Sequence, residues 1–198
     1  TVICWVFPET DSTKRDHRKS TRHPSERWTR SRCFGEAFNL KLARHIVSFL
    51  KRRGIEAAAP VQIPGWQITT AHHSGFASSW SERHAAYVSG LGTFGLCDGL
   101  ITPAGKAVRI GSAVARVTLQ PTIRPYTSIN QWCLFYSRGS CRACIDRCPA
   151  GALSRHGHDK RICAEYVINK MAAYTGKRFG MQVYSCGLCQ TGVPCESG

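Results

Sequence analysis

Cysteine spacing constrains this chain more than any other feature of its sequence. Seven of the eleven cysteines lie between Cys141 and Cys195, and Cys133 stands just before them. The run Cys141-Arg-Ala-Cys144-Ile-Asp-Arg-Cys148-Pro149 reads C-x2-C-x3-C-P, and Cys186-Gly-Leu-Cys189 adds a second C-x2-C pair. Such tight spacing lets several thiolates from one loop face the same inorganic centre. The spacing therefore predicts that these eight cysteines form two sets of four ligands.

The crossing rule of bacterial ferredoxins assigns the two sets. The first run matches the back part of C-x2-C-x2-C-x3-C-P, in which the cysteine before the proline ligates the other of two clusters. We therefore predict two [4Fe–4S] clusters. The first cluster takes Cys133, Cys141, Cys144 and Cys195. The second cluster takes Cys148, Cys163, Cys186 and Cys189.

Cys133 departs from the usual spacing. Seven residues separate it from Cys141, where the ferredoxin run has two. Gly139 and Ser140 are flexible enough for a loop that brings Cys133 back. Without that loop, the first centre would be a three-cysteine, site-differentiated cluster or a [3Fe–4S] cluster.

Three other interpretations compete for the cysteines. Structural zinc suits C-x2-C pairs, but not C-x2-C-x3-C-P with a distant partner set. A disulfide framework suits a small secreted domain. Unligated buried thiols are the interpretation that we prefer for the three scattered cysteines Cys4, Cys33 and Cys97.

Length and composition exclude several classes of protein. The chain has 198 residues, of which 42% are hydrophobic, too many for a disordered protein. No apolar run approaches the roughly 18 residues of a membrane-spanning helix, so no span is expected. The chain begins at Thr1 without an initiator Met and ends soon after Cys195. Both ends look cut, so a signal peptide or a partner domain is expected outside this sequence.

Periodicity predicts ordered elements in the first half of the chain. Residues 2–7 are predicted as a buried strand, residues 37–50 as an amphipathic helix that stops at Gly54, and residues 55–60 as a second strand. This β–loop–α–β order favours an α/β layer. Ser79-Trp80-Ser81-Glu82 has the capping-box pattern that opens a helix over residues 82–88.

Further elements set the expected domains. Residues 100–102 and 109–119 are predicted as strands, and residues 159–175 as a helix that carries Cys163. We expect an α/β (α+β) domain over residues 1–128. A bacterial-ferredoxin-like domain with two [4Fe–4S] clusters follows over residues 129–198.

The positive charge is concentrated near the N-terminus. The formal net charge is +15, and residues 14–32 hold eight Lys or Arg against Asp16 and Glu26. Residues 9–34 are therefore expected to form a basic loop on the surface. Such a loop could bind nucleic acid phosphates, or it could be solvated, or it could close over a cofactor. Trp28 is its only tryptophan, so base stacking is not indicated.

Several stretches together resemble the epoxyqueuosine reductase family, which is related to the reductive dehalogenases. Coverage runs from about Trp80 to Cys195. The segment with the E-R-x-A-x-x-x-G-L-G-x-x-G pattern is the more specific part, and the cysteine runs are shared by many iron–sulfur proteins. The stretches are Ser81–Gly95, Gly111-Ser112, Cys141–Leu153 and Cys186–Gln190.

This resemblance implies a fold, cofactors and roles. In that family an α/β domain holds cobalamin against a domain with two [4Fe–4S] clusters, and reduced cobalt removes oxygen or halogen from the substrate. The implied cofactor-binding positions are the motif arginine and the glycine-rich turn, namely Arg83, Gly90, Leu91, Gly92 and Gly95. Implied partners are an electron donor such as a ferredoxin or flavodoxin, and tRNA.

One departure from the family puts its tRNA reaction in doubt. Epoxyqueuosine reductases place a proton-donating aspartate about seven residues before the motif arginine, where this chain has Phe76. Reductive C–O cleavage needs an acid for the leaving oxygen. The replacements that we consider are His72, His73, His84 and Tyr87, with His84 and Tyr87 retained as catalytic candidates.

Three functions follow from these observations. The first is an iron–sulfur oxidoreductase that relays electrons through two clusters to a catalytic centre, with cobalamin implied by the resemblance. The second is a ferredoxin-like electron-transfer module without catalysis of its own. The third is a zinc-containing nucleic-acid-binding protein. Reduced thiolates and oxygen-sensitive clusters suit a cytoplasmic location.

Overall fold

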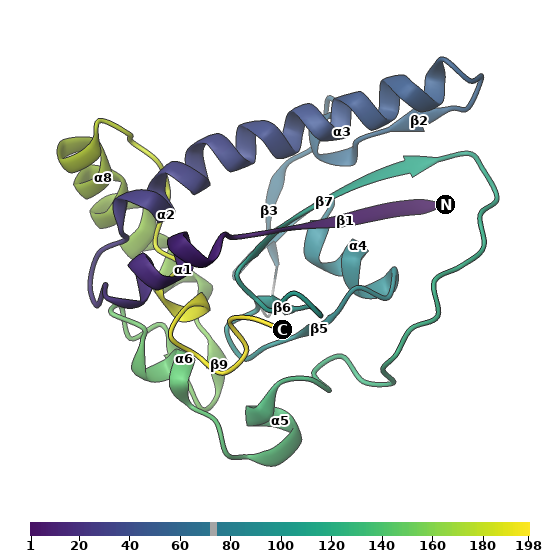
Figure 1. The fold of residues 1–198 in the computed structure, drawn as a ribbon. Coiled ribbons are helices and arrows are strands. Elements are labelled where there is room, and N and C mark those ends of the chain that lie inside the picture. Colours follow the sequence, from purple (N-terminus) through teal and green to yellow (C-terminus); the bar gives the residue numbers. More distant parts are fainter. Residues whose placement is uncertain (72–74) are drawn as a thin grey trace.

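A three-stranded antiparallel sheet forms the centre of the fold. The computed structural model describes residues 1–71 and 75–198. Strand β7 (Val108–Ala115) lies between β1 (Val2–Pro8) and β2 (Ala57–Ala58) (Figure 1). β1 pairs with β7 along its whole length, from Val2 opposite Val114 to Pro8 opposite Val108. The strand predicted at residues 2–7 is therefore confirmed, but it is half-buried and not buried as expected, and Phe7 is exposed.

One long helical run covers this sheet. It comprises α2 (Glu26–Arg30), a π-helical segment (Ser31–Gly35) and α3 (Glu36–Lys51). Asn39 of α3 accepts a hydrogen bond from Trp5 Nε1 at 2.8 Å and donates to the Ile110 carbonyl at 2.9 Å. A Cβ at position 111 would lie 2.5 Å from the Trp5 ring, so the glycine there makes room for this contact. The predicted helix and its contact with the sheet are confirmed.

The fold class is mixed helix and sheet, as predicted. β1 and β2 both run antiparallel to β7, so they point the same way with β7 inserted between them. The predicted β–loop–α–β order is present, but the second strand is two residues long and not the six expected at 55–60. The remaining pairs are three short antiparallel ladders: β3 (Ile68–Ala71) with β4 (Gly75–Ser78), β5 (Thr93–Phe94) with β6 (Leu100–Ile101), and β8 (Leu153–Ser154) with β9 (Gly157–His158).

The basic segment is helical and partly buried, so the prediction of a surface loop at residues 9–34 was wrong. Thr10 caps α1 (Asp11–Arg18), and Ser25 caps α2. His17 is fully buried and stacks on Trp28, with ring centroids 4.3 Å apart. Lys14 is also buried. These inward-facing side chains pack the segment against the body of the protein, whereas Arg22, Arg27 and Arg30 of the same segment are exposed.

Arg147 fastens this segment to the C-terminal half of the chain. Its guanidinium group is half-buried and lies between α1 and the turn after Cys186. It donates hydrogen bonds of 3.0–3.4 Å to the carbonyl oxygens of His17, Arg18, Ser20 and Leu188 and to the hydroxyl of Thr191. One cation therefore satisfies carbonyl groups at the end of α1 and on the cysteine-rich loop at once.

We expect Arg147→Met to lower the free energy of unfolding by about 1.5–3 kcal/mol, because hydrogen bonds from a charged donor contribute on this scale. Arg142→Met is the matched control, since Arg142 is exposed and caps α6 without a side-chain hydrogen bond. Its effect should stay within about 0.5 kcal/mol. Urea unfolding of the two variants, followed by circular dichroism, measures the difference. Equal midpoints would contradict the role of Arg147.

Helix α4 (Glu82–Val88) follows the predicted capping pattern, but its N-cap is Ser81 and not Ser79. The Ser81 hydroxyl accepts from the His84 amide at 3.4 Å. The turn after α4 leads through β5 and β6 into β7, and it packs Phe94 and Leu100 against Ala86 in a buried cluster. This cluster supports the underside of the sheet next to the cysteine-rich region.

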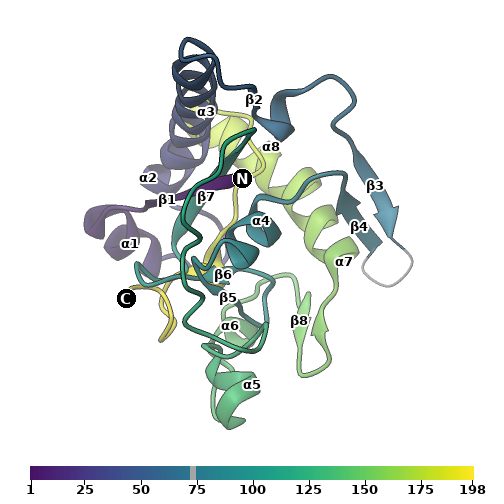
Figure 2. The ribbon, with the colours of Figure 1, turned by 90° about the vertical axis from the view of Figure 1, so that its right-hand side faces the viewer.

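The C-terminal part of the chain consists of short elements (Figure 2). The predicted helix at 159–175 is confirmed and extends to Phe179. No helix within the described ranges is long and apolar enough to cross a membrane. In chain order the elements are α5 (Leu134–Arg138), α6 (Ala143–Asp146), β8 (Leu153–Ser154), β9 (Gly157–His158), α7 (Lys160–Glu165), a π-helical segment (Tyr166–Met171) and α8 (Ala172–Phe179).

Candidate metal centres

The four cysteines predicted for the first cluster line one small cavity. Cys133 precedes α5, and Gly139 ends that helix with a φ of 65°, a conformation that suits glycine. The chain then returns to Cys141, so the loop predicted for Cys133 is present. The cavity holds about 20 Å³, room for a single water-sized group. Its cysteines are Cys133, Cys141, Cys144 and Cys195, and Lys106 lies among them.

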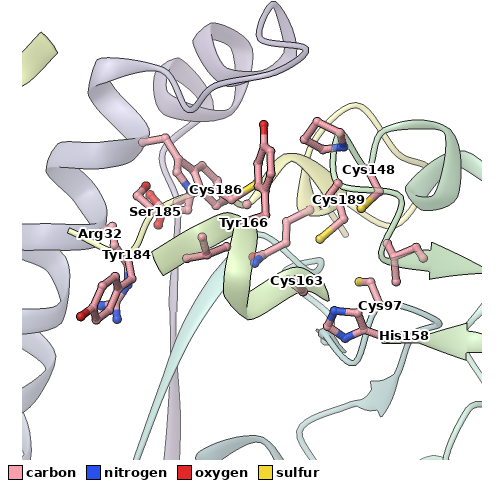
Figure 3. Close-up of a pocket in the computed structure, with 18 of the residues that line it drawn as sticks. Arg32, Cys97, Cys148, His158, Cys163, Tyr166, Tyr184, Ser185, Cys186 and Cys189 are labelled. Carbon is pink, nitrogen blue, oxygen red and sulfur yellow. The ribbon is translucent and has the colours of Figure 1, made fainter. Parts of the chain in front are cut away.

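The four cysteines predicted for the second cluster line a larger cavity of about 310 Å³ (Figure 3). They are Cys148, Cys163, Cys186 and Cys189. Cys163 comes from α7, Cys189 from a 3-10 helical turn (Leu188–Gln190), and Cys148 and Cys186 from loops. Burial raises the pKa of the Cys186 thiol to about 11. The structure thus brings together residues from three separate stretches of the chain.

Cys97 joins the two sets, although its spacing in the sequence does not group it with them. It lies in a turn after β5 and is only 6% exposed. Hydrogen bonds from the thiols of Cys144 and Cys189 hold the pKa of Cys97 well below its usual range, despite burial. Cys144 belongs to the first set and Cys189 to the second, so Cys97 marks the point where the two sets meet.

All eleven cysteines lie within the described ranges, and all are free thiols. Among the described residues, no three His, Cys, Asp or Glu side chains converge on the position of a single metal ion. The structure therefore pairs none of the cysteines in a disulfide framework. Both sets surround a cavity, but neither is shaped as a four-ligand site for one zinc ion.

Lys106 is a buried cation that lines the first cavity and contacts Cys97. Its side chain is 3% exposed, and its Nζ lies 3.3 Å from Cys97 Sγ. Burial lowers the Lys106 pKa, but thiolate charges outweigh it and leave the pKa above its usual value; Cys97 contributes most, followed by Cys195 and Cys189. A Cβ at position 99 would lie 2.9 Å from Lys106 Cδ, so Gly99 leaves space for the lysine stem.

A second polar cluster lies at the edge of the larger cavity. His158 Nδ1 is 3.0 Å from the Asp98 carboxylate, and Lys160 Nζ is 3.8 Å from it. Burial lowers the His158 pKa, but hydrogen bonds to Asp98 and Cys163 outweigh it, and the pKa is about 9. Asp98 has a φ of 57°, rare outside glycine, and its carbonyl accepts from Arg83. Arg83 therefore lines the cysteine cavity.

The wall of the larger cavity includes the helical basic segment. Trp28 lines it, and a Cβ at position 187 would lie 2.2 Å from the Trp28 ring. Gly187 also has a φ of 68°, so the turn between Cys186 and Cys189 requires glycine for two reasons. Burial lowers the pKa of His17 to about 4, a shift that the nearby backbone of Cys186 and Gly187 offsets in part. His17 is therefore a neutral packing group at neutral pH.

The glycine-rich turn packs closely against other parts of the chain. A Cβ on Gly92 would lie 2.2 Å from the Ile101 carbonyl oxygen, and one on Gly90 would lie 3.4 Å from Thr122. Gly95 approaches Ile101 in the same way. The space at Gly90 and Gly92 is thus filled by the chain itself. These glycines are explained by packing, and we derive no step through cobalamin.

The catalytic candidates lie apart from the cysteine cavities. His84 and Tyr87 sit one turn apart on α4, and neither lines either cavity. His84 packs on Phe94 with ring centroids 4.7 Å apart, and burial lowers its pKa. Tyr87 stacks on Tyr126 at 5.3 Å. His72 and His73 lie outside the described residues.

The sequence reasoning missed Cys97, Asp98, Lys106 and His158. Cys97 lacks a partner at C-x2-C spacing, so spacing alone could not identify it. Asp98 and His158 are 60 residues apart and meet only in the fold. The sequence holds one local pattern at this site, Gly99-x6-Lys106 beside a cysteine. This pattern is too common to predict a functional site.

The architecture and the cysteine cavities define a mixed helix-and-sheet protein with the fold of epoxyqueuosine reductase structures. A selenomethionine-labelled epoxyqueuosine reductase has a TM-score of 0.55 at 19% identity, over 98% of this chain and 48% of that one. The Bacillus subtilis enzyme has a TM-score of 0.51 at 19% identity, over 100% of this chain and 48% of that one. At this identity the likeness concerns the fold. No family model matches the chain.

The sequence itself is similar to epoxyqueuosine reductases. The Bacillus anthracis protein of that name is 27% identical over 159 residues, which are 78% of this chain and 39% of that protein. The Bacillus cereus protein matches over the same shares of both chains. The predicted resemblance to the epoxyqueuosine reductase family is therefore confirmed. The chain spans about two fifths of the length of these curated relatives.

Proposed function

We propose that this chain is the electron-relaying part of an iron–sulfur reductase related to the epoxyqueuosine reductases. The observation that carries the proposal is the placement of the eight predicted ligands around two cavities: four line the smaller cavity, and the other four line the larger one together with Cys97. The name of the relatives supports a reductase. Bound [4Fe–4S] clusters would accept and release single electrons.

The donor sets support clusters better than single metal ions. Each iron of a cubane binds one cysteine, so four thiols must surround a volume and need not converge on a point. The second set lines a cavity of about 310 Å³, which suits this requirement. The first cavity is small, so its thiols would have to move apart to admit a cluster.

Different residues would ligate the clusters, form the wall of the second cavity and hold the two cysteine sets together. Cys133, Cys141, Cys144 and Cys195 would hold the first cluster, and Cys148, Cys163, Cys186 and Cys189 the second. The packed helix α2 excludes water from the second cavity through Trp28. The contacts of Cys97 with Cys144 and Cys189 keep the two sets adjacent, which favours electron transfer between them.

Anaerobic reconstitution of the chain with iron and sulfide tests this function. We expect about eight irons per chain and a visible absorbance that bleaches on reduction with dithionite. The alternative of a zinc-containing nucleic-acid-binding protein predicts bound zinc without iron. That result would contradict the proposal, because neither cavity would then hold a redox centre.

An electron-transfer module without catalysis is the second candidate. It is favoured by the position of His84 and Tyr87 away from both cavities and by the filled glycine turn. Both candidates take electrons from a small donor such as a ferredoxin or flavodoxin, and both suit the cytoplasm. Titration of the iron-loaded chain with cobalamin separates them: a change in the corrinoid spectrum supports the catalytic version, and an unchanged spectrum supports the module.

A further inference from the structure

We propose that Lys106 is a buried cation placed between the two cysteine sets, where its charge raises the reduction potentials of the clusters. This inference rests on the proposed function, because it concerns clusters held by those sets. Lys106 acts through its charge and is not a catalytic residue. Its position follows from the strand order, since it lies two residues before β7.

The backbone fixes Lys106 beside both sets. Its amide donates to the Cys195 carbonyl at 2.8 Å, which ties it to the last cysteine of the first set. Its side chain lines the first cavity. Its Nζ contacts Cys97 at 3.3 Å, and Cys97 lines the second cavity and receives a hydrogen bond from Cys189. The ammonium group therefore lies at the junction of the two sets.

The charge of Lys106 has no carboxylate partner in the described part of the chain. The nine ion pairs found there do not include it. A buried ammonium ion is costly unless a negative charge compensates for it. Its Nζ contacts Cys97, and the charges of Cys195, Cys189 and Cys144 also act on it. Among these groups, the charge of Lys106 is therefore balanced by thiolates or by the clusters that they ligate.

The physical effect follows from the sign of the charges. A [4Fe–4S] cluster with four thiolates carries a net charge of about −2, and one added electron makes it more negative without breaking a bond. A fixed cation nearby stabilises the reduced form more than the oxidised form, and low dielectric strengthens this attraction. Removing the cation should therefore make both clusters harder to reduce, and the first cluster more so, because Lys106 lines its cavity.

The test compares reduction potentials in the anaerobically reconstituted full chain. Potentials are measured by mediated redox titration with dithionite as reductant, followed by absorbance and electron paramagnetic resonance. In Lys106→Met and Lys106→Gln, the reduced-to-oxidised ratio of the first cluster at a fixed potential should fall at least about tenfold, which is about 59 mV for one electron. Lys106→Arg should stay close to the unmodified chain. Lys41→Met is the control, because Lys41 is exposed on α3.

Each outcome decides the matter. Unchanged potentials in the neutral variants with eight irons bound would overturn the inference and leave the proposed function standing. If neither neutral variant loads iron but Lys106→Arg does, the charge is needed to balance the clusters, which supports the inference. Loss of iron from all three variants would overturn it, because side-chain shape would then matter and charge would not. Absence of iron from the unmodified chain would refute the proposed function itself.

Discussion

Cys186→Ala is expected to reduce bound iron from about eight to about four atoms per chain. Cys186 is one of four cysteines on the larger cavity, and it lies on the turn that Gly187 and Trp28 hold in place. Alanine removes one ligand of that set and leaves the first set untouched. The measurement is iron and sulfide content after anaerobic reconstitution, with circular dichroism to show that the fold persists.

Cys33→Ala is the matched control for this experiment. Cys33 is half-buried in the π-helical segment before α3 and lines neither cavity. Its variant should keep all of the iron. If Cys186→Ala also keeps all of the iron, or if Cys33→Ala loses half, the assignment of the second set is wrong.

Trp28→Ala is expected to lower the free energy of unfolding by about 3–5 kcal/mol, the range for removing a large buried aromatic side chain. Trp28 is 5% exposed, stacks on His17 and fills the space above Gly187. Its loss leaves a cavity beside the second cysteine set, so iron in that set should also become more accessible to chelators. Urea unfolding of the iron-loaded chain gives the first quantity, and the rate of iron capture by bathophenanthroline gives the second.

Trp66→Ala distinguishes this local effect from a general loss of tryptophan packing. Trp66 is 37% exposed, and its indole donates one hydrogen bond at 3.3 Å to the Trp80 carbonyl. Its removal should cost about 1 kcal/mol or less and should leave chelation unchanged. A Trp28 variant as stable and as resistant to chelation as the Trp66 variant would contradict the role of the basic segment as the wall of the cavity.

Spacing predicted the parts of the site that are local in sequence. The two thiols of a C-x2-C pair must lie close together, because only two residues separate them. The pairing of Cys141 with Cys144 and of Cys186 with Cys189 was therefore predictable. The crossing rule extended this to Cys148, and the loop at Gly139 makes the approach of Cys133 feasible. The ligand roles themselves stay predictions until iron is measured.

Contacts between distant residues were beyond the reach of spacing. Residues 14–32 are rich in charge, which predicted a solvated loop, but His17 and Trp28 are buried by partners more than 150 residues away. Lys106 could not be singled out from the sequence, because its partners are thiols that come together only in the folded chain. The fold class was predictable from the strand–helix–strand order, whereas the insertion of β7 between β1 and β2 was not.

The ion pair between Arg18 and Glu196, at 2.9 Å, has a consequence for how the protein is made. With the contacts of Arg147 to α1, it joins segments separated by 127–178 positions. Native contacts at such separations slow folding, because long loops must close before any stabilising contact forms. During synthesis on a ribosome, α1 could form this ion pair only after Glu196 had left the exit tunnel. The second cysteine set would therefore stay open to iron donors at least until Glu196 had emerged.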